Sequence, residues 1–347
     1  MASNEEQRRG PAGASDAREL EPGSRPSGQA GFEQVGGERI DKSAREAESG
    51  EKPKVKRTTR AKNAVLEKTP QKLKNPSDTQ VRIRTGAVYI GLNTIAVLLG
   101  NLPTAIILAV TAAICAGEFY FMERADAKMP NEVIGVVAAA LFPLAMYFFG
   151  FKGVVIVLAF FLLALLIWYV FWIYARVSDV SICFFGAAYT GLLLCGLLVI
   201  RMSIDEFWGG ILLLLLFLSV WGNDAFAYLA GRKFGKHKLA PRVSPKKTWE
   251  GFFGGIVSSM VFWCLMSLVP GVSMSIPQAL LFGVVCGSME VLGDLAESRI
   301  KRNAGVKDSG TIMPGHGGLL DRCDSLFLAS ITACLLLVLG GCIPFSL

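Results

Sequence analysis

The sequence predicts an all-α, polytopic integral membrane protein with about nine transmembrane helices and a disordered N-terminal tail. Of its 347 residues, 52% are hydrophobic and only 18% are charged, whereas an ordinary soluble domain carries about 25% charged residues. The charge is also uneven, because the first 84 residues hold 18 basic and 13 acidic side chains. The remaining 263 residues carry a net charge of only +2. This composition argues against a soluble enzyme, a coiled coil or a disordered chain for that remainder.

The N-terminal tail, residues 1–80, is rich in Gly, Ser, Pro and charged residues. It cannot bury enough apolar surface to offset the entropy lost on ordering, so we expect it to be a disordered cytoplasmic tail. Residues 81–347 form the predicted transmembrane domain. The basic stretch from Lys52 to Lys62 either contacts anionic lipid headgroups or only orients the chain in the membrane.

Apolar runs follow one another after Arg84, and each is close to the ~20 residues that cross a bilayer core. The first two meet at Asn101, Leu102 and Pro103 with almost no connecting segment, so we expect them to form a short hairpin. The predicted spans are roughly 85–100, 102–121, 132–150, 153–174, 181–200, 207–229, 251–269, 277–296 and 325–344.

The basic residues predict how these spans are oriented. With nine crossings and a cytoplasmic N-terminus, the two strongly basic connections, 230–250 and 297–324, both fall on the cytoplasmic side, as the positive-inside rule requires. Membrane orientation therefore explains the pI near 9.0, and we expect no nucleic-acid partner. No signal or transit segment precedes the spans, which favours a bacterial inner membrane.

The eight cysteines predict no metal or disulfide framework. Most lie in apolar stretches, no CxxC pair occurs, and the chain has only two histidines. We therefore expect buried free thiols.

The first of the two basic connections is preceded by a polar pair inside an apolar helix. Placing a carboxylate such as Asp224 there costs about 2.5–3.5 kcal/mol. Asn223 and Asp224 are therefore expected to face a polar cavity, a cation or a basic partner; the alternative is that Asp224 only reaches the headgroup layer. Further along, hydroxyls and ammonium groups of the kind that suit a polyphosphate follow one another: Ser244, Lys246, Lys247 and Thr248. A positive-inside loop would explain the lysines equally well.

The second connection is flanked by carboxylates. Glu290, Asp294 and Glu297 are spaced i, i+4 and i+7, so they share one helix face. Asp321 and Asp324 add two more where the last helix begins. A hard divalent cation such as Mg²⁺ is the simplest neutraliser of such a group; the alternative for Asp324 is a favourable interaction with the helix dipole.

Between these carboxylates lie cations and a glycine-rich turn: Lys301, Arg302, Lys307, Arg322, Gly315, His316, Gly317 and Gly318. Because His316 lies among glycines, we do not expect it to be a packed core residue. The glycines let backbone amides approach a ligand closely. Carboxylates for a metal together with cations for phosphate indicate phosphoryl or nucleotidyl transfer, which depends on positioning and charge neutralisation.

Two longer patterns cover this part of the chain. Asp-x-x-Ala-Tyr, Gly-Arg-x-Phe-Gly and Ser-Pro-Lys-Lys-Thr-x-Glu-Gly run from Asp224 to Gly251. The second pattern is matched by Ser298, Lys301, Arg302, Lys307, Asp308, Pro314, His316, Gly317, Gly318, Asp321, Arg322 and Asp324. Over residues 80–347 the chain thereby resembles the phosphatidate cytidylyltransferase family, the CDP-diacylglycerol synthases.

This resemblance implies that CTP and phosphatidate give CDP-diacylglycerol and pyrophosphate for phospholipid biosynthesis. It implies Mg²⁺, with a second cation left open, a homodimer in the lipid bilayer, and a site facing the cytosol and inner leaflet. We expect Asp294, Asp321 and Asp324 to hold the metal, and these three with His316 to be the catalytic residues. The expected substrate-binding residues are Asn223, Asp224, Ser244, Lys246, Lys247, Thr248, Ser298, Lys301, Arg302, Lys307, Asp308, Gly317, Gly318 and Arg322.

Two other functions fit parts of the sequence. Another CTP-dependent lipid enzyme, such as a polyprenol kinase or a synthase acting on ether lipids, would need similar phosphate and metal groups. A transporter for a phosphorylated anion would also place charges in membrane helices. It would, however, predict inverted repeats and charges at the bilayer midplane, and the sequence shows no repeat.

Overall fold

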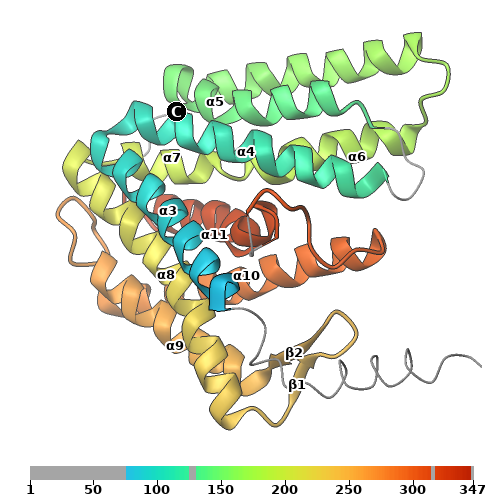
Figure 1. Cartoon of the computed structure of the whole chain (residues 1–347). Coiled ribbons are helices and arrows are strands. Elements are labelled where there is room, and N and C mark those ends of the chain that lie inside the picture. The colour runs from blue at the N-terminus through green and yellow to red at the C-terminus, as the bar shows by residue number, and fades with distance from the viewer. Residues whose placement is uncertain (1–75, 125–129, 314–316, 345–347) are drawn as a thin grey trace, which may run out of the picture. The chain divides into compact units, whose positions relative to one another are not determined.

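The computed structural model describes residues 76–124, 130–313 and 317–344, so the predicted tail lies almost entirely outside the described residues. These residues form a bundle of helices with one small β hairpin (Figure 1), which confirms the all-α class. The elements are α3 (Pro76–Leu99), α4 (Asn101–Glu123), α5 (Glu132–Phe171), α6 (Val177–Ala187), the π-helical turn η3 (Ala188–Leu192), α7 (Cys195–Met202), α8 (Glu206–Phe234), β1 (Lys238–Ala240), β2 (Ser244–Thr248), α9 (Trp249–Met266), α10 (Ile276–Asn303) and α11 (Leu320–Leu339).

Seven helical segments in the described ranges are long and apolar enough to cross a membrane, and Arg84–Leu99 is a shorter apolar helix. One of the seven, α5, is 40 residues long and is broken at Gly150, where φ is 62°. The rings of Phe142 and Phe161 are 6.4 Å apart, although an unbroken helix would separate the two residues by about 28 Å. The two halves of α5 therefore fold back on each other (Figure 1). The exact count of nine spans stays a prediction.

The expected hairpin between the first two spans is present. Gly100 separates α3 from α4 and has a φ of 126°, a conformation that L-residues rarely adopt. The eight cysteines are free, and all except the half-buried Cys264 are buried, which confirms the expected thiols.

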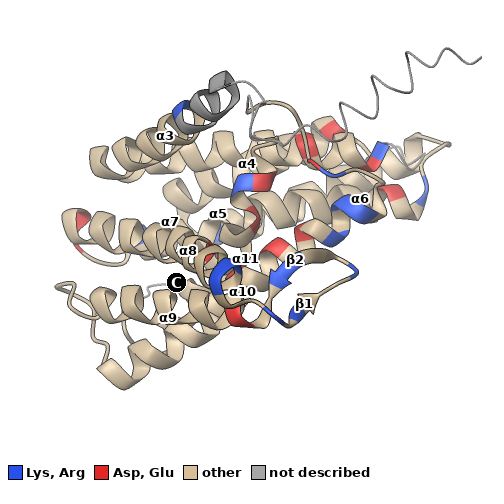
Figure 2. Ribbon diagram, turned by 60° about the horizontal axis from the view of Figure 1, so that its bottom comes forward, with Lys and Arg blue, Asp and Glu red and all other residues tan. Residues whose placement is uncertain are grey.

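Charged residues gather at one end of the helical bundle, where β1 and β2 lie (Figure 2). This end carries the turns from α8 to α9 and from α10 to α11. In the last turn of α7, near the opposite end, the buried Arg201 donates to the carbonyl oxygens of Val97 and Glu206, at 3.2 and 2.6 Å. The chain thus separates a charged end from a largely apolar remainder, in agreement with the charge pattern of the sequence.

Helices α10 and α11 approach each other closely at the charged end of the bundle. At Gly293 on α10, a Cβ atom would lie 2.6 Å from the carbonyl oxygen of Asp324 on α11. Glycine therefore lets α10 approach the first turn of α11 directly. This approach brings the carboxylate-bearing turns of the two helices side by side.

The β hairpin carries the lysines of the first basic connection. β1 and β2 pair antiparallel, with Lys238 opposite Thr248. Thr248 is the N-cap of α9, and its hydroxyl accepts a hydrogen bond from the amide of Gly251 at 3.2 Å. His237, just before β1, contacts Glu250 in the first turn of α9 through Nδ1 and Oε1, 2.7 Å apart. The hairpin is thus attached to α9 at both of its ends.

Candidate active site

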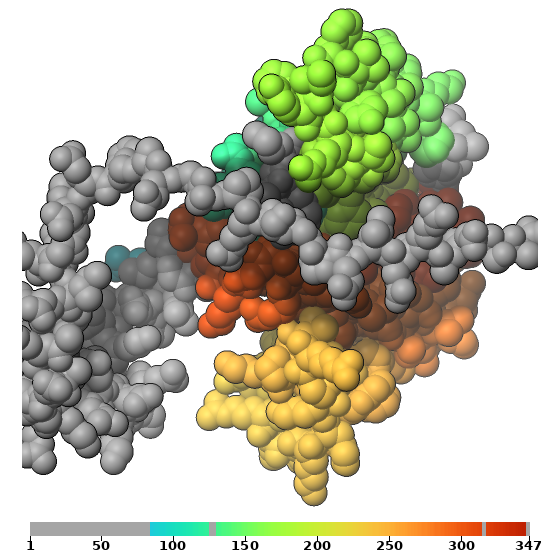
Figure 3. All heavy atoms as spheres, turned by 90° about the vertical axis from the view of Figure 1, so that its right-hand side faces the viewer, coloured from blue at the N-terminus to red at the C-terminus, as the bar shows by residue number. Residues whose placement is uncertain are grey.

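A cavity of about 570 Å³ opens at the charged end of the bundle, between α8, the β hairpin, α9, α10 and α11. In Figure 3 the yellow surface around the hairpin and the orange surface of α10 and the loop after it lie next to each other on one face of the molecule. The cavity is lined by Asp224, Ala227, Tyr228, Gly231, Arg232, Leu239, Lys246, Lys247, Thr248, Gly251, Phe252, Val291, Asp294, Lys301, Asp308, Asp321, Arg322 and Asp324.

The structure brings most of the expected site residues to this one cavity. Those that line it are Asp224, Lys246, Lys247, Thr248, Asp294, Lys301, Asp308, Asp321, Arg322 and Asp324. Those that lie outside its lining are Asn223, Ser244, Ser298, Arg302, Lys307, Gly317 and Gly318. His316 lies outside the described residues. Segments separated by more than 70 residues in the sequence therefore meet at one place.

Three carboxylates, which we call the acidic trio, face the cavity with few partners: Asp224, Asp294 and Asp324. Asp224 and Asp324 each lie close enough to Asp294 for the negative charges to repel. Asp294 is partly compensated, because Lys247 Nζ lies 2.7 Å from Oδ2 and the Ser298 hydroxyl donates to Oδ1 at 3.1 Å. Asp324 accepts a hydrogen bond from the adjacent Ser325 amide at 2.7 Å. Repelling carboxylates in a cavity are the kind of group that a cation stabilises.

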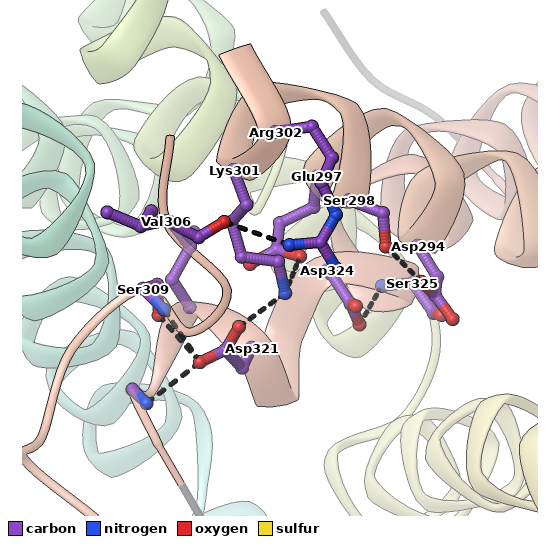
Figure 4. A network of polar contacts seen from close by, with 12 residues as sticks. Asp294, Glu297, Ser298, Lys301, Arg302, Val306, Ser309, Asp321, Asp324 and Ser325 are labelled. Atoms are coloured by element: carbon purple, nitrogen blue, oxygen red, sulfur yellow. Dashed lines mark hydrogen bonds and ion pairs between the residues drawn. The ribbon is translucent and has the colours of Figure 1, made fainter. Parts of the chain in front are cut away.

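Asp321 lies in a different environment, in which both of its oxygens have partners (Figure 4). Its Oδ1 is 2.5 Å from Lys301 Nζ. Its Oδ2 accepts from the amide of Ser309 at 2.9 Å, the hydroxyl of Ser309 at 3.0 Å and the amide of Gly318 at 2.9 Å. Asp321 therefore ties the loop between α10 and α11 to the start of α11, and any metal would have to displace these contacts.

Glu118 on α4 completes this group, although it is not among the site residues expected from the sequence. Its carboxylate is 5% exposed and accepts hydrogen bonds from the amides of Leu319 and Leu320, at 3.1 and 2.8 Å, and from the Ser309 hydroxyl at 3.3 Å. Amides at the start of a helix have no partner within the helix, so Glu118 supplies one for α11. A carboxylate within an apolar helix was the signal that could have identified it.

We call Glu118, Lys301, Ser309, Asp321 and Gly318 the loop anchor. It leaves no room for a side chain at Gly318, whose added Cβ would collide with the Ser309 hydroxyl and would lie 2.5 Å from the carboxylate of Glu118. Gly317 has a φ of 88°, which only glycine adopts without strain. The two glycines are therefore required by the conformation of the turn.

The three carboxylates on the shared face of α10 do not meet at one site, because each contacts a different set of neighbours. Glu290 is 1% exposed and accepts from the amide of Asn223 and, at 3.3–3.4 Å, from the hydroxyls of Ser219 and Ser259. Asp294 faces the cavity, and Glu297 pairs with Lys301. The i, i+4, i+7 spacing was correct, but the helix twist carries the three groups to different neighbours.

The remaining expected residues lie at the edge of the site. Arg302 donates to the carbonyl oxygen of Val306 at 3.0 Å and is exposed. Lys307 and Asp308 are exposed on the loop after α10. Ser244 begins β2 and pairs with Ala240. Of these four side chains, only Asp308 reaches the cavity.

The donor set of the cavity fits a hard divalent cation in its chemistry. Carboxylate oxygens are the ligands that Mg²⁺ prefers, and the acidic trio supplies three of them. Within the described part of the chain, however, no three Asp, Glu, His or Cys side chains are already close enough together to hold a metal ion. Binding one would require these side chains to turn toward a common point.

The cations of the cavity differ in how free they are. Lys301 pairs with Glu297 and Asp321, and Lys247 pairs with Asp294. Lys246 is exposed beside them, and Arg232 is exposed at the end of α8. Exposed cations next to a cation-binding group of carboxylates can bind and orient polyphosphates.

Comparisons with known proteins agree with this chemistry. The model of the cytidylyltransferase family matches residues 80–339. The phosphatidate cytidylyltransferase of Bacillus subtilis is 32% identical over 253 residues, which cover 72% of this chain and 93% of that protein. Phosphatidate cytidylyltransferase 5, chloroplastic, of Arabidopsis thaliana is 34% identical over 298 residues, which cover 76% of this chain and 73% of that protein.

A shorter and more similar match lies in the phosphatidate cytidylyltransferase of Staphylococcus epidermidis. It is 46% identical over 147 residues, or 42% of this chain, and this match spans 55% of the length of that protein. The chain thus spans about half the length of the first curated relatives it matches. The family model nevertheless covers nearly all of the described bundle, and the chain belongs to the cytidylyltransferase family.

Proposed function

We propose that this protein transfers a cytidylyl group from CTP to phosphatidate, giving CDP-diacylglycerol and pyrophosphate. The observation that carries the proposal is the cavity, in which the acidic trio faces exposed and paired cations at the end of an apolar helical bundle. A lipid phosphate stays at the bilayer and a nucleoside triphosphate stays in water, so the two can meet only where a polar cavity adjoins the bilayer. Membership of the cytidylyltransferase family supports the choice of nucleotide.

In the proposed reaction, an oxygen of the phosphatidate phosphate attacks the α-phosphorus of CTP. A new P–O bond forms, the bond from the α-phosphorus to the oxygen bridging to the β-phosphate breaks, and pyrophosphate leaves with that electron pair. A phosphate monoester has its second pKa near ~6, so it is largely ionised at neutral pH and requires no strong protein base. The chain's task is to position two anions and to offset their repulsion.

The proposed roles follow from the contacts. Lys246, Lys247 and Arg322 bind phosphate groups, and Lys301 mainly positions Asp321. Arg302 and Lys307, which lie outside the cavity lining, belong to the rim of the site and contact incoming anions. The sequence assigns His316 to the same glycine-rich turn, where it orients phosphate or shapes the turn. Ser298 positions Asp294 through its hydrogen bond.

Mg²⁺ is the cofactor that we propose for this site, with a second cation left open. When bound, it offsets phosphate charge and polarises the α-phosphate. Asp294 and Asp324 are its proposed ligands, together with Asp321 if that carboxylate exchanges its present partners. Asp224 supports the same ion from α8, and its closeness to Asp294 is the observation that adds it to the group.

The membrane side and the assembly are proposals as well. The basic connections at the charged end support a cytoplasmic site, with the N-terminus on the same side. The membrane that we propose is a cell membrane, the inner membrane of a bacterium. The family resemblance supports a homodimer. Accessibility of single introduced cysteines in inverted vesicles and light scattering of the purified protein in detergent test these two statements.

The decisive experiment uses CTP labelled at either of two positions. The purified full chain, in mixed micelles with phosphatidate and Mg²⁺, should transfer the label of [α-³²P]CTP into lipid and release unlabelled pyrophosphate. Transfer from [γ-³²P]CTP into a polyprenol would identify a kinase instead, and ether-lipid acceptors would be preferred by the corresponding synthase. Accumulation of phosphorylated anion in vesicles without incorporation into lipid would favour a transporter. Any of these three results would overturn the proposal.

A further inference from the structure

The walls of the cavity differ in their chemistry. The side built from α10 and α11 is strongly charged, with Asp294, Lys301, Asp321, Arg322 and Asp324. The side built from α8, β1 and α9 carries Asp224, Arg232 and the Tyr228 hydroxyl among apolar residues and glycines, which are Ala227, Gly231, Leu239, Gly251 and Phe252. Lys246, Lys247 and Thr248 come from β2, between these elements. Arg232 is the one cation that α8, β1 and α9 contribute to the described lining. The cavity is thus charged on one side and amphipathic on the other.

The proposed substrates differ in the same way. A nucleoside triphosphate is polar throughout, whereas phosphatidate carries a phosphate on two acyl chains that must stay in hydrocarbon. Only a wall that continues into the lipid-facing surface can accept those chains. The outer surface next to the amphipathic wall has large exposed apolar side chains, among them Phe226 (54% exposed) and Leu229 (58%) on α8 and Phe253 (61%) on α9.

A stripe along α8 connects the acidic trio to the end of this helix. Asp224, Tyr228 and Arg232 are spaced i, i+4 and i+8, so they lie on one helix face, and all three line the cavity. With a rise of about 1.5 Å per residue, Arg232 is roughly 12 Å from Asp224 along the helix. Tyr228 is 64% exposed between them, and tyrosine favours the boundary between hydrocarbon and water.

Arg232 is available for a ligand. It lies in the last turn of α8, where a long side chain can extend from the apolar region to the headgroup layer. In the described ranges, no carboxylate lies within ion-pair distance of its guanidinium. Lys247 and Lys301, by contrast, already pair with carboxylates in the cavity.

We propose that Arg232 binds the phosphate of the lipid substrate at the α8 side of the cavity, with Tyr228 against its glycerol and upper acyl region. The charged α10–α11 side then receives the nucleotide. The proposal rests on the proposed function, because it assigns the two substrates of that reaction to two walls. A planar guanidinium suits this role, because it can form two parallel hydrogen bonds to a phosphate.

The next residue provides a matched control. Lys233 is also a cation in the last turn of α8, but it does not line the cavity, and its ammonium lies 5.2 Å from the centre of the Phe234 ring. Replacing either residue with alanine removes one positive charge from the same surface. Only Arg232→Ala removes it from the cavity.

The experiment measures KM for each substrate in mixed micelles of the full chain. Loss of a charged hydrogen bond of this kind costs about 10- to 100-fold in affinity, so Arg232→Ala should raise the KM for phosphatidate by that factor and leave the KM for CTP unchanged. Arg232→Lys should restore part of the loss, and Lys233→Ala should change neither KM. A rise in the KM for CTP alone, equal effects of Arg232→Ala and Lys233→Ala, or no effect of Arg232→Ala would each overturn the assignment.

A binding measurement separates this proposal from the proposed function. Dioctanoyl phosphatidate and CTP should each raise the unfolding temperature of the wild-type chain. Arg232→Ala should lose the shift given by dioctanoyl phosphatidate and keep the shift given by CTP. If the wild-type chain binds both molecules without turnover, the proposed reaction fails while the assignment of the lipid wall stands. If Arg232→Ala keeps both shifts, the assignment fails whatever the activity.

Discussion

The acidic trio and the loop anchor are neighbouring groups of carboxylates that the structure treats in opposite ways. In the loop anchor, Asp321 and Glu118 accept seven hydrogen bonds from backbone amides, the Ser309 hydroxyl and Lys301, with each oxygen engaged. In the acidic trio, Asp224 has no hydrogen-bond or ion-pair partner among the described residues. A buried carboxylate with several donors holds structure, whereas carboxylates that repel one another in a cavity are ready for a ligand.

The largest expected effect is loss of turnover when the acidic trio is changed. Asp294→Asn and Asp324→Asn should each lower kcat/KM on the order of 10²–10³-fold, the size of losing one preorganised charge contact, with little change in the unfolding temperature. Steady-state assays over a range of Mg²⁺ concentrations measure this. Asp205→Asn keeps an equally good N-cap at the far end of α8 and should remain active. Normal activity of Asp294→Asn at low Mg²⁺ would refute its role.

For Asp321 we expect a loss of stability instead, because this residue belongs to the loop anchor. Asp321→Asn should lower the free energy of unfolding by about 2–3 kcal/mol. This is at or below the low end of the cost of breaking a buried ion pair, because Lys301 keeps its ion pair with Glu297. The buried free cysteines make a thiol-reactive dye a suitable reporter of unfolding. If this variant kept wild-type stability and lost only Mg²⁺ dependence, Asp321 would be a metal ligand in the working enzyme, and the distinction between the two groups would fail.

Glu118→Gln tests the loop anchor from α4. Glutamine keeps only one acceptor oxygen, so its NH2 group would face the amide of either Leu319 or Leu320. A buried donor would then be left unsatisfied, at a cost of about 1–3 kcal/mol. We expect a lower unfolding temperature and lower turnover together, because the loop carries the glycine-rich turn. Thermal unfolding and activity of the same preparation provide the measurement. Unchanged values for both would remove Glu118 from the anchor.

The smallest effect concerns backbone conformation. Gly317→Ala forces an L-residue to a φ of 88° and should destabilise the chain by about 1 kcal/mol. Gly117→Ala is the matched control: it lies in α4 with no atom within 4 Å of the added Cβ, and it should be neutral or slightly stabilising. Equal behaviour of the two variants would show that the turn adopts another conformation.

Much of this architecture follows from local patterns in the sequence. Hydropathy predicted where most of the helices lie. The reversal at Gly150 agrees with the predicted break between 150 and 153. The charge bias predicted one polar end, and the bundle has one. These properties depend on residues that are near one another in the chain.

The partners within the site could not be predicted in this way. The sequence puts Glu290, Asp294 and Glu297 on one face, but which neighbour each one meets depends on how α8, α9 and α11 pack around α10. Asp321 and Asp324 are three residues apart, yet one joins the loop anchor and the other faces the cavity. Glu118 was missed because its partners lie about 200 residues further along the chain.

The contact between Glu118 and Leu320 has a consequence for biosynthesis. These residues are 202 positions apart, so α4 leaves the ribosome long before the segment whose amides it will bind. Until α11 inserts, the Glu118 carboxylate lacks those donors, and the turn before α11 lacks the contacts that hold it. A nascent chain lacking its final span is therefore expected to be inactive and prone to degradation by membrane quality control, even with every earlier helix in the bilayer.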